Sequence, residues 1–149
     1  MKRARLAFAL VTVTASLGSA QTKPNFSGTW VQMTPADGAG SEIVVKHDAA
    51  TLVQQHDSEG GGHVLKYMLD GAEHRNEPMA MGDGQITGRH KATWDDARLV
   101  IDESNEYPNG GHRTAHIVWW INDKGQLVIE GKISGVGERL DFTSTYRRK

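Results

Sequence analysis

Short runs of alternating apolar and polar residues, broken by glycine-rich turns, dominate this sequence from residue 26 onward. Such alternation puts apolar side chains on one face of a strand and polar ones on the other. The runs recur about every 12 residues, the spacing typical of a β-sandwich or barrel. They predict strands over residues 26–33, 42–47, 51–55, 63–69, 85–94, 98–103, 113–121, 126–133 and 139–146. No helical period competes with this pattern, although residues 41–55 permit a short helix.

The connections between these runs indicate how the strands are joined. Residues 95–97, 122–125 and 135–137 are short links rich in Asp, Asn and Gly, which favour tight turns. Short links join antiparallel neighbours, because parallel neighbours need a crossover of about a dozen residues. The second half therefore reads as a meander of four or five strands. With many strands and little helix, the sheet must close or pack to protect its edges. We predict an all-β domain, an antiparallel meander closing into a barrel of about 8–10 strands.

The same alternation predicts which side chains face the barrel interior. Within residues 98–103, Leu99, Ile101 and Glu103 lie on one face and the intervening residues on the other. The candidate interior residues obtained in this way are His90, Leu99, Ile101, Glu103, Ile117, Trp119, Leu127, Ile129, Leu140 and Phe142. Trp119 and Trp120 must face opposite sides, and the pattern alone leaves open which one is inside. The outward tryptophan would favour a partner or self-association surface.

The first twenty residues have the composition of a signal peptide. Lys2, Arg3 and Arg5 form a positive segment, residues 6–14 are uncharged, and small residues end at Ala20. The apolar run is too short to span a bilayer, which takes about 20 residues. We therefore expect cleavage near Ala20, a periplasmic or secreted location, and one mature domain over residues 21–149.

Composition excludes several classes of site and partner. The sequence has no cysteine, so disulfides, thiolate nucleophiles and thiolate metal ligands are absent. Three of the 17 basic residues fall within the first twenty positions, which leaves 14 basic and 18 acidic residues and a mature charge of −4. Because the two signs are interspersed, no basic face is expected for nucleic acid. No segment after the first twenty is apolar enough to predict a membrane span.

The two ends of the predicted domain carry the most specific motif. Gly28-Thr29-Trp30 opens the first strand, and the last strand ends with Arg147 and Arg148. In these features the chain resembles the calycin superfamily, which includes lipocalins, fatty-acid-binding proteins and secreted bacterial lipocalin-like proteins. The resemblance implies a lipocalin-like barrel whose closed end is plugged by Trp30, with Arg147 or Arg148 across its indole ring. The helix pair of fatty-acid-binding barrels and the later lipocalin motifs are missing, so no ligand site is carried over.

Candidate chemistry is limited to a few inward polar residues. The seven histidines show no chelating spacing, because His112 and His116 would lie about 13 Å apart on a strand. We therefore expect no metal and no cofactor. His90 and Glu103 would point into an apolar interior, where an ionisable group needs a partner. The pair would orient a ligand or act as an acid–base pair, unless Glu103 lies in solvent and His90 is an ordinary wall residue.

Three functional hypotheses follow. The first is an exported lipocalin-like protein that binds a small, mainly apolar ligand inside the barrel, with His90 and Glu103 giving polar specificity. An eight-stranded barrel is just wide enough to be filled by side chains or to hold one small molecule. The second is a packed barrel that acts as an interaction or structural module without a ligand. The third, which the resemblance implies, is an isomerase-like or cyclase-like barrel enzyme using the inward histidine and glutamate.

Overall fold

The computed structural model describes residues 22–56, 62–135 and 137–149, and within them the protein is all β. The predicted signal peptide lies outside these described residues. A single 3-10 turn, η1 (Ala36–Gly38), follows the first strand. The strands are β1 (Gly28–Thr34), β2 (Glu42–His47), β3 (Thr51–His56), β4 (His63–Met68), β5 (Glu73–Arg75), β6 (Met79–Met81), β7 (Gly84–Asp95), β8 (Arg98–Glu106), β9 (His112–Ile121), β10 (Leu127–Gly135) and β11 (Glu138–Arg148).

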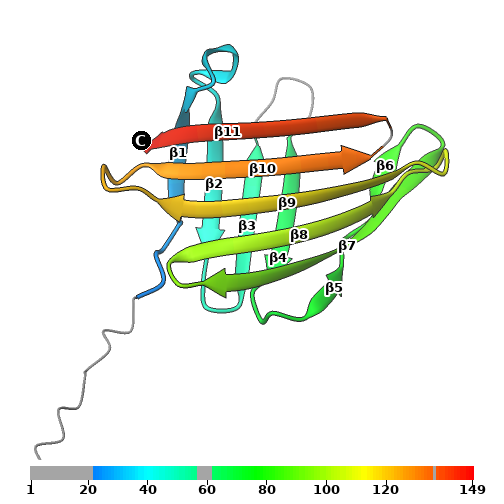
Figure 1. The fold of residues 1–149 in the computed structure, drawn as a ribbon, viewed down its shortest axis with the longest axis horizontal. Coiled ribbons are helices and arrows are strands. Elements are labelled where there is room, and N and C mark those ends of the chain that lie inside the picture. The colour runs from blue at the N-terminus through cyan, green and yellow to red at the C-terminus, as the bar shows by residue number, and fades with distance from the viewer. Residues whose placement is uncertain (1–21, 57–61, 136) are drawn as a thin grey trace, which may run out of the picture.

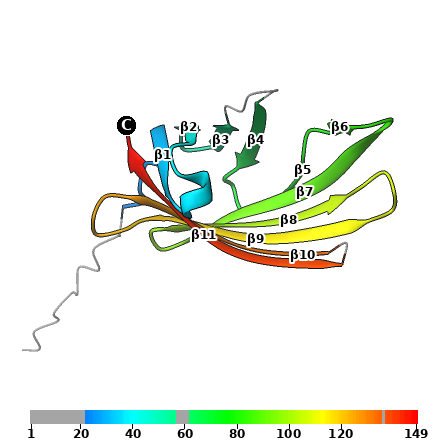
Figure 2. The ribbon, with the colours of Figure 1, turned by 90° about the horizontal axis from the view of Figure 1, so that it is seen from above.

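All eleven strands belong to one antiparallel arrangement that wraps into a nearly closed barrel. Ten strands follow the order β4-β3-β2-β1-β11-β10-β9-β8-β7-β5, and β6 pairs with β7. Viewed from the front, β1–β4 run at a steep angle behind β7–β11 (Figure 1). The view from above shows two layers, with β5 and β6 beside β4 over the far end of the long strands (Figure 2). The fold is therefore a sheet folded over on itself at the β1–β11 pairing.

Side chains of the inner faces fill the space between the two layers. Trp30 from β1, Leu52 from β3, Leu99 from β8 and Trp119 from β9 are among the fully or almost fully buried residues. Of the two adjacent tryptophans, Trp119 is the inner one. Trp120 is only partly exposed and lies under the guanidinium of Arg98, 5.1 Å from its ring centre. The outward tryptophan is therefore partly covered by a neighbouring strand.

The closed end of the barrel is built around Trp30. The Arg148 guanidinium lies 4.5 Å from the indole centre, and Arg147 makes no such contact with Trp30. Arg148 also donates a hydrogen bond to the Ser27 carbonyl at 2.7 Å, and the Trp30 Nε1–H donates to the Phe26 carbonyl at 2.8 Å. These contacts join the first strand to the last by a cation–π pair and by backbone pairing of Trp30 with Arg148.

The predicted all-β meander is confirmed, with corrections at the weakest elements. All nine predicted strands are present, and the second half, expected to be a meander of four or five strands, has five, β7–β11. Residues 41–55 contain β2 and β3, not a helix. The sequence reading missed β5 and β6, each only three residues long, so the strand number is slightly above the expected 8–10.

Candidate ligand-binding pocket

Most of the predicted lining residues form a packed core. Leu99, Ile101, Trp119 and Leu127 are almost completely buried, Ile129 is 5% exposed, and Ile117 and Phe142 pack against this cluster. Leu140, expected inside, is 52% exposed. The structure thus brings the other apolar residues of the predicted set together in the hydrophobic core. A pocket is present instead near the end of the barrel where Leu140 lies.

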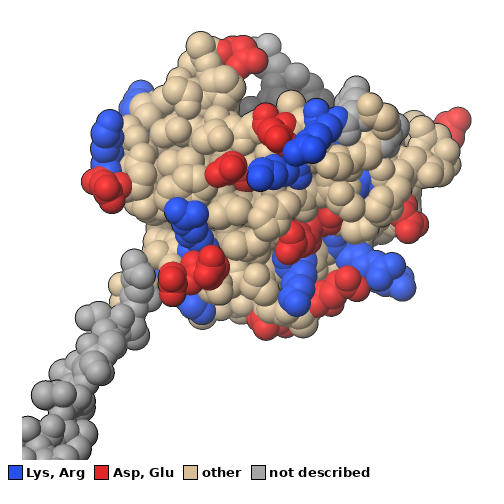
Figure 3. Space-filling model, viewed as in Figure 1, with Lys and Arg blue, Asp and Glu red and all other residues tan. Residues whose placement is uncertain are grey.

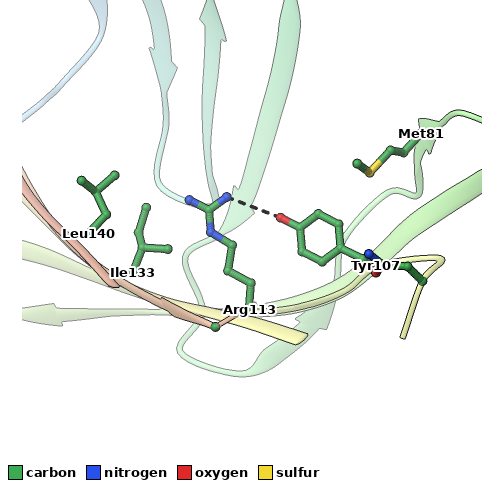
Figure 4. Close-up of a pocket in the computed structure, with 7 residues that line it drawn as sticks. Met81, Tyr107, Arg113, Ile133 and Leu140 are labelled. Atoms are coloured by element: carbon green, nitrogen blue, oxygen red, sulfur yellow. Dashed lines mark hydrogen bonds between the residues drawn. The ribbon is translucent and has the colours of Figure 1, made fainter. Parts of the chain in front are cut away.

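The larger of the two described pockets lies at the end opposite Trp30. It has a volume of about 260 Å³ and is lined by Met81, Tyr107, Asn109, Arg113, Ile133, Gly135 and Leu140. These residues come from β6, from the β8–β9 connection, and from the adjacent ends of β9, β10 and β11. Figure 4 shows the Arg113 side chain rising between Ile133 and Leu140 on one side and Tyr107 on the other. Only Leu140 belongs to the predicted lining.

Apolar side chains at this end remain accessible to solvent. Met81 and Leu140 are about half exposed, at 51% and 52%. Ile133 is half-buried and directly opposite Leu140 in the β10–β11 ladder. Large apolar residues gathered at the mouth of a pocket are typical of ligand or partner contacts.

Arg113 gives the pocket its charge. Its position in β9, two residues from buried Ala115, places the side chain on the inner face, where it is half-buried. The guanidinium donates one hydrogen bond to the Tyr107 hydroxyl at 3.4 Å. None of the ion pairs formed among the described residues includes Arg113. A cation partly withdrawn from water in apolar surroundings is stabilised by an anionic partner.

A polar cluster joins β4 to the inner face of β7 and β8. The Tyr67 hydroxyl donates to Glu103 Oε1 at 2.5 Å. His90 Nε2 accepts the Met68 amide at 2.9 Å, and His90 Nδ1 is 2.6 Å from Asn76 Oδ1. Burial raises the pKa of Tyr67 well above its usual range, and the Glu103 carboxylate beside it adds to that rise. Burial lowers the pKa of His90, helped by nearby His74 and opposed by Asp70.

His90 and Glu103 do not form the acid–base pair considered from the sequence. They are cross-strand partners in β7 and β8, but each bonds other groups. Both ring nitrogens of His90 are engaged, by Met68 and by Asn76, and its side chain is only 3% exposed. Neither residue lines the described pocket. This geometry gives His90 and Glu103 structural partners and offers no open site for proton transfer.

Among the described residues, no group of three or more His, Cys, Asp or Glu side chains could hold a metal ion. In residues 22–56, 62–135 and 137–149 no helix has the length and apolar character needed to cross a membrane. On the face viewed in Figure 3, basic and acidic side chains are interspersed, as the sequence had indicated.

Comparison with known proteins gives no family assignment, since neither a protein-family model nor a curated protein matches the sequence.

Proposed function

We propose that this protein binds a small amphiphilic molecule at the open end of its barrel. Met81, Ile133 and Leu140 would contact the apolar part, and the Arg113 guanidinium would bind an anionic group. The observation that carries this proposal is the half-buried guanidinium of Arg113, which lies beside Ile133 and Leu140 in the pocket and, among the side chains that the structure describes, bonds only the neutral Tyr107 hydroxyl. A planar guanidinium matches a carboxylate with two parallel hydrogen bonds.

The size of the pocket supports a small ligand or one end of a longer one. Its volume of about 260 Å³ is slightly below the roughly 300–1,000 Å³ typical of pockets for drug-sized molecules. The proposal includes a lipocalin-like origin and export, supported by the Gly28-Thr29-Trp30 motif, the Arg148 contact and the signal-like first twenty residues. It favours a binding protein over an enzyme, because the inward His90 and Glu103 are engaged elsewhere.

Calorimetry with decanoate and decanol tests this function, because the two probes share a chain and differ in charge. We expect the wild type to bind decanoate more tightly than decanol. Arg113→Gln should weaken decanoate binding by roughly 10- to 100-fold, the range for losing a hydrogen bond to a charged group of about 1.5–3 kcal/mol. Binding of decanol should change little.

Arg147→Gln is the matched control, because Arg147 is an exposed arginine near the closed end. It should bind decanoate like the wild type. Equal affinity of wild type and Arg113→Gln for decanoate would exclude Arg113 as the anion site. Absence of binding for both probes up to millimolar concentration would favour the packed interaction module instead.

A further inference from the structure

The barrel is closed along one side by side chains and not by a strand ladder. Strand β4 lies at one end of the sheet order, with β7 and β5 at the other, and no ladder joins β4 to β7 among the described residues. Side chains cross this gap: the Tyr67 hydroxyl of β4 reaches Glu103 of β8, and His90 of β7 reaches the Met68 amide of β4. We call these four residues the seam.

The His90 bond requires the neutral form of the imidazole. A backbone N–H can only donate, so His90 Nε2 must carry a lone pair to accept the Met68 amide. The remaining proton is then on Nδ1, which donates to Asn76 Oδ1. Asn76 in turn donates to Asn105 Oδ1 at 3.2 Å, so the orientation of each group is fixed by the next. Protonation of Nε2 would set two donors against each other and leave the Met68 amide without its acceptor.

Charged and titratable groups surround His90 on each packed element. Tyr67 of β4 contacts the imidazole edge-on, with ring centres 5.3 Å apart. Glu103 of β8 is the cross-strand partner of His90 and accepts the hydrogen bond from the Tyr67 hydroxyl. His74 of β5 stacks at 5.8 Å, and its Nε2 is 2.8 Å from Asp70. A charged His74 would oppose a second charge on His90, whereas Asp70 would favour it. Burial works against protonation, so the neutral, closed form is the stable one near neutral pH.

We propose that His90 is a pH-sensitive closure of the seam: neutral His90 keeps β4 on β7, and its protonation releases β4 and opens the barrel beside the pocket. The link to the pocket lies in the sheet register. A row of cross-strand partners runs from the seam to the pocket lining through His90, Glu103, Ala115, Ile133 and Leu140. Asn105, at the end of the His90 chain of hydrogen bonds, is the cross-strand partner of Arg113. The opening is a property of the barrel itself and does not depend on a ligand.

NMR spectroscopy and amide hydrogen exchange of the wild type test this closure directly. At pH 7.5 the nitrogen shifts should show a neutral His90 protonated on Nδ1. As the pH drops from the ordinary histidine pKa of 6.5 toward the lowered pKa of His90 in the closed barrel, the protection factor of the Met68 amide should fall by up to about tenfold per pH unit, because each opening is linked to uptake of one proton. The amide of Ile129, within β10 and distant in sheet order from β4, serves as the internal reference and should keep its protection.

Two glutamine variants separate this closure from general acid effects. His90→Gln keeps an acceptor for the Met68 amide and a donor for Asn76 but cannot be protonated, so its Met68 protection should not vary with pH. His116→Gln removes an exposed histidine on the outer face, bonded to Asp102, and should behave like the wild type.

The result that overturns the proposal is available from the wild type alone, even if His90→Gln does not fold. Met68 protection that stays constant from pH 7.5 down to the lowered pKa of His90 would exclude the closure, as would an Nε2–H tautomer at neutral pH. A fall in protection that persists in His90→Gln would assign the opening to another group.

Discussion

The Arg148 side chain makes two contacts that Arg147, its neighbour in sequence, does not make. It covers the buried indole of Trp30 and donates to the Ser27 carbonyl, whereas Arg147 points to solvent on the opposite face of β11. Which of the two arginines reaches the Trp30 ring therefore depends on which one lies on the inner face of β11. The sequence named both arginines because the exact end of the last strand sets that parity, and end positions are the weakest part of any strand prediction.

Replacing each arginine by methionine keeps much of the side-chain length and removes the charge. Arg148→Met should lower the free energy of unfolding by roughly 0.5–2 kcal/mol, the range for a cation–π pair. Arg147→Met should change it by less than about 0.5 kcal/mol, as for other surface positions. Urea unfolding of both variants measures the difference, and equal losses would show that the indole contact contributes nothing specific.

Arg113 was also within reach of sequence reasoning at this scale. It shares strand parity with Ala115, Ile117 and Trp119, so the alternation that identified inner residues already placed a basic side chain among them. Met81 carried no such signal, because it lies in a three-residue strand without β-branched neighbours. The inward position of Arg113 was therefore predictable, whereas the contribution of Met81 to the pocket was not.

At the scale of strands, β10 and β11 fit together through a glycine opposite an aromatic ring. Gly131 is the cross-strand partner of Phe142, and a Cβ at Gly131 would overlap the Phe142 ring. Because Gly131 has no side chain, the Phe142 ring can lie over it and pack against the buried cluster. Such pairs fix strand register, since a slip by one residue would move the ring to the outer face.

Gly131→Val tests this pairing, with Lys132→Val as the control on the outer face of the same strand. Gly131→Val should lower the free energy of unfolding by roughly 1–3 kcal/mol, because an overfilled core must shift its neighbours. Lys132 is exposed, and its replacement should cost less than about 0.5 kcal/mol. Chemical denaturation followed by tryptophan fluorescence gives both values. A Gly131→Val protein as stable as the control would mean that Phe142 moves freely.

The long strands were predictable because they repeat the alternation over many residues. Strand β2 was predicted with the bounds it has in the structure. Strand β8 was predicted to end at Glu103 but continues for three more residues, to Glu106. Strands β5 and β6 have the sequences Glu-His-Arg and Met-Ala-Met, which are too short to show a period of two. They form because the free edge of β7 pairs with them, and this edge is a tertiary feature.

At the scale of the whole molecule, histidines link stability to pH. Burial lowers the pKa of His47, His56 and His90 below the usual value of 6.5. His47 Nδ1 accepts the Phe26 amide at 3.2 Å, so it too is bound in its neutral form. Below pH 6.5 these histidines therefore bind more protons in the unfolded chain than in the folded protein.

The free energy of unfolding should therefore fall as the pH drops from 6.5 through the lowered pKa values of these three histidines. Above pH 7.5 it should be insensitive to them, because they are neutral in both states. Urea midpoints measured at pH 7.5 and pH 5.5 check this, with the lower midpoint expected at pH 5.5. A higher midpoint at pH 5.5 would contradict the sign of the shifts.

The position of the pocket depends on how the two layers cross, and this is why the sequence misplaced it. Alternation tells which face of a strand is inner, but it does not tell how far along the strand the opposite layer extends. Leu99 and Leu140 were both predicted to face inward, yet Leu99 is fully buried in the core cluster with Trp30 and Leu52, and Leu140 is exposed at the pocket. The β1–β4 layer is held against the long strands by the pairing of β1 with β11, between residues more than a hundred positions apart.

The pairing of the first strand with the last cannot form until synthesis of the chain is almost complete. Ser27 and Arg148 are bonded across 121 positions of sequence, and β11 supplies the partner of both β1 and β10. While the ribosome is still synthesising the polypeptide, both of these strands lack that neighbour and expose backbone groups that can pair with another chain. A nascent polypeptide of this kind benefits from chaperone protection until translation ends, and loss of the eleven residues of β11 would leave the same two edges permanently open.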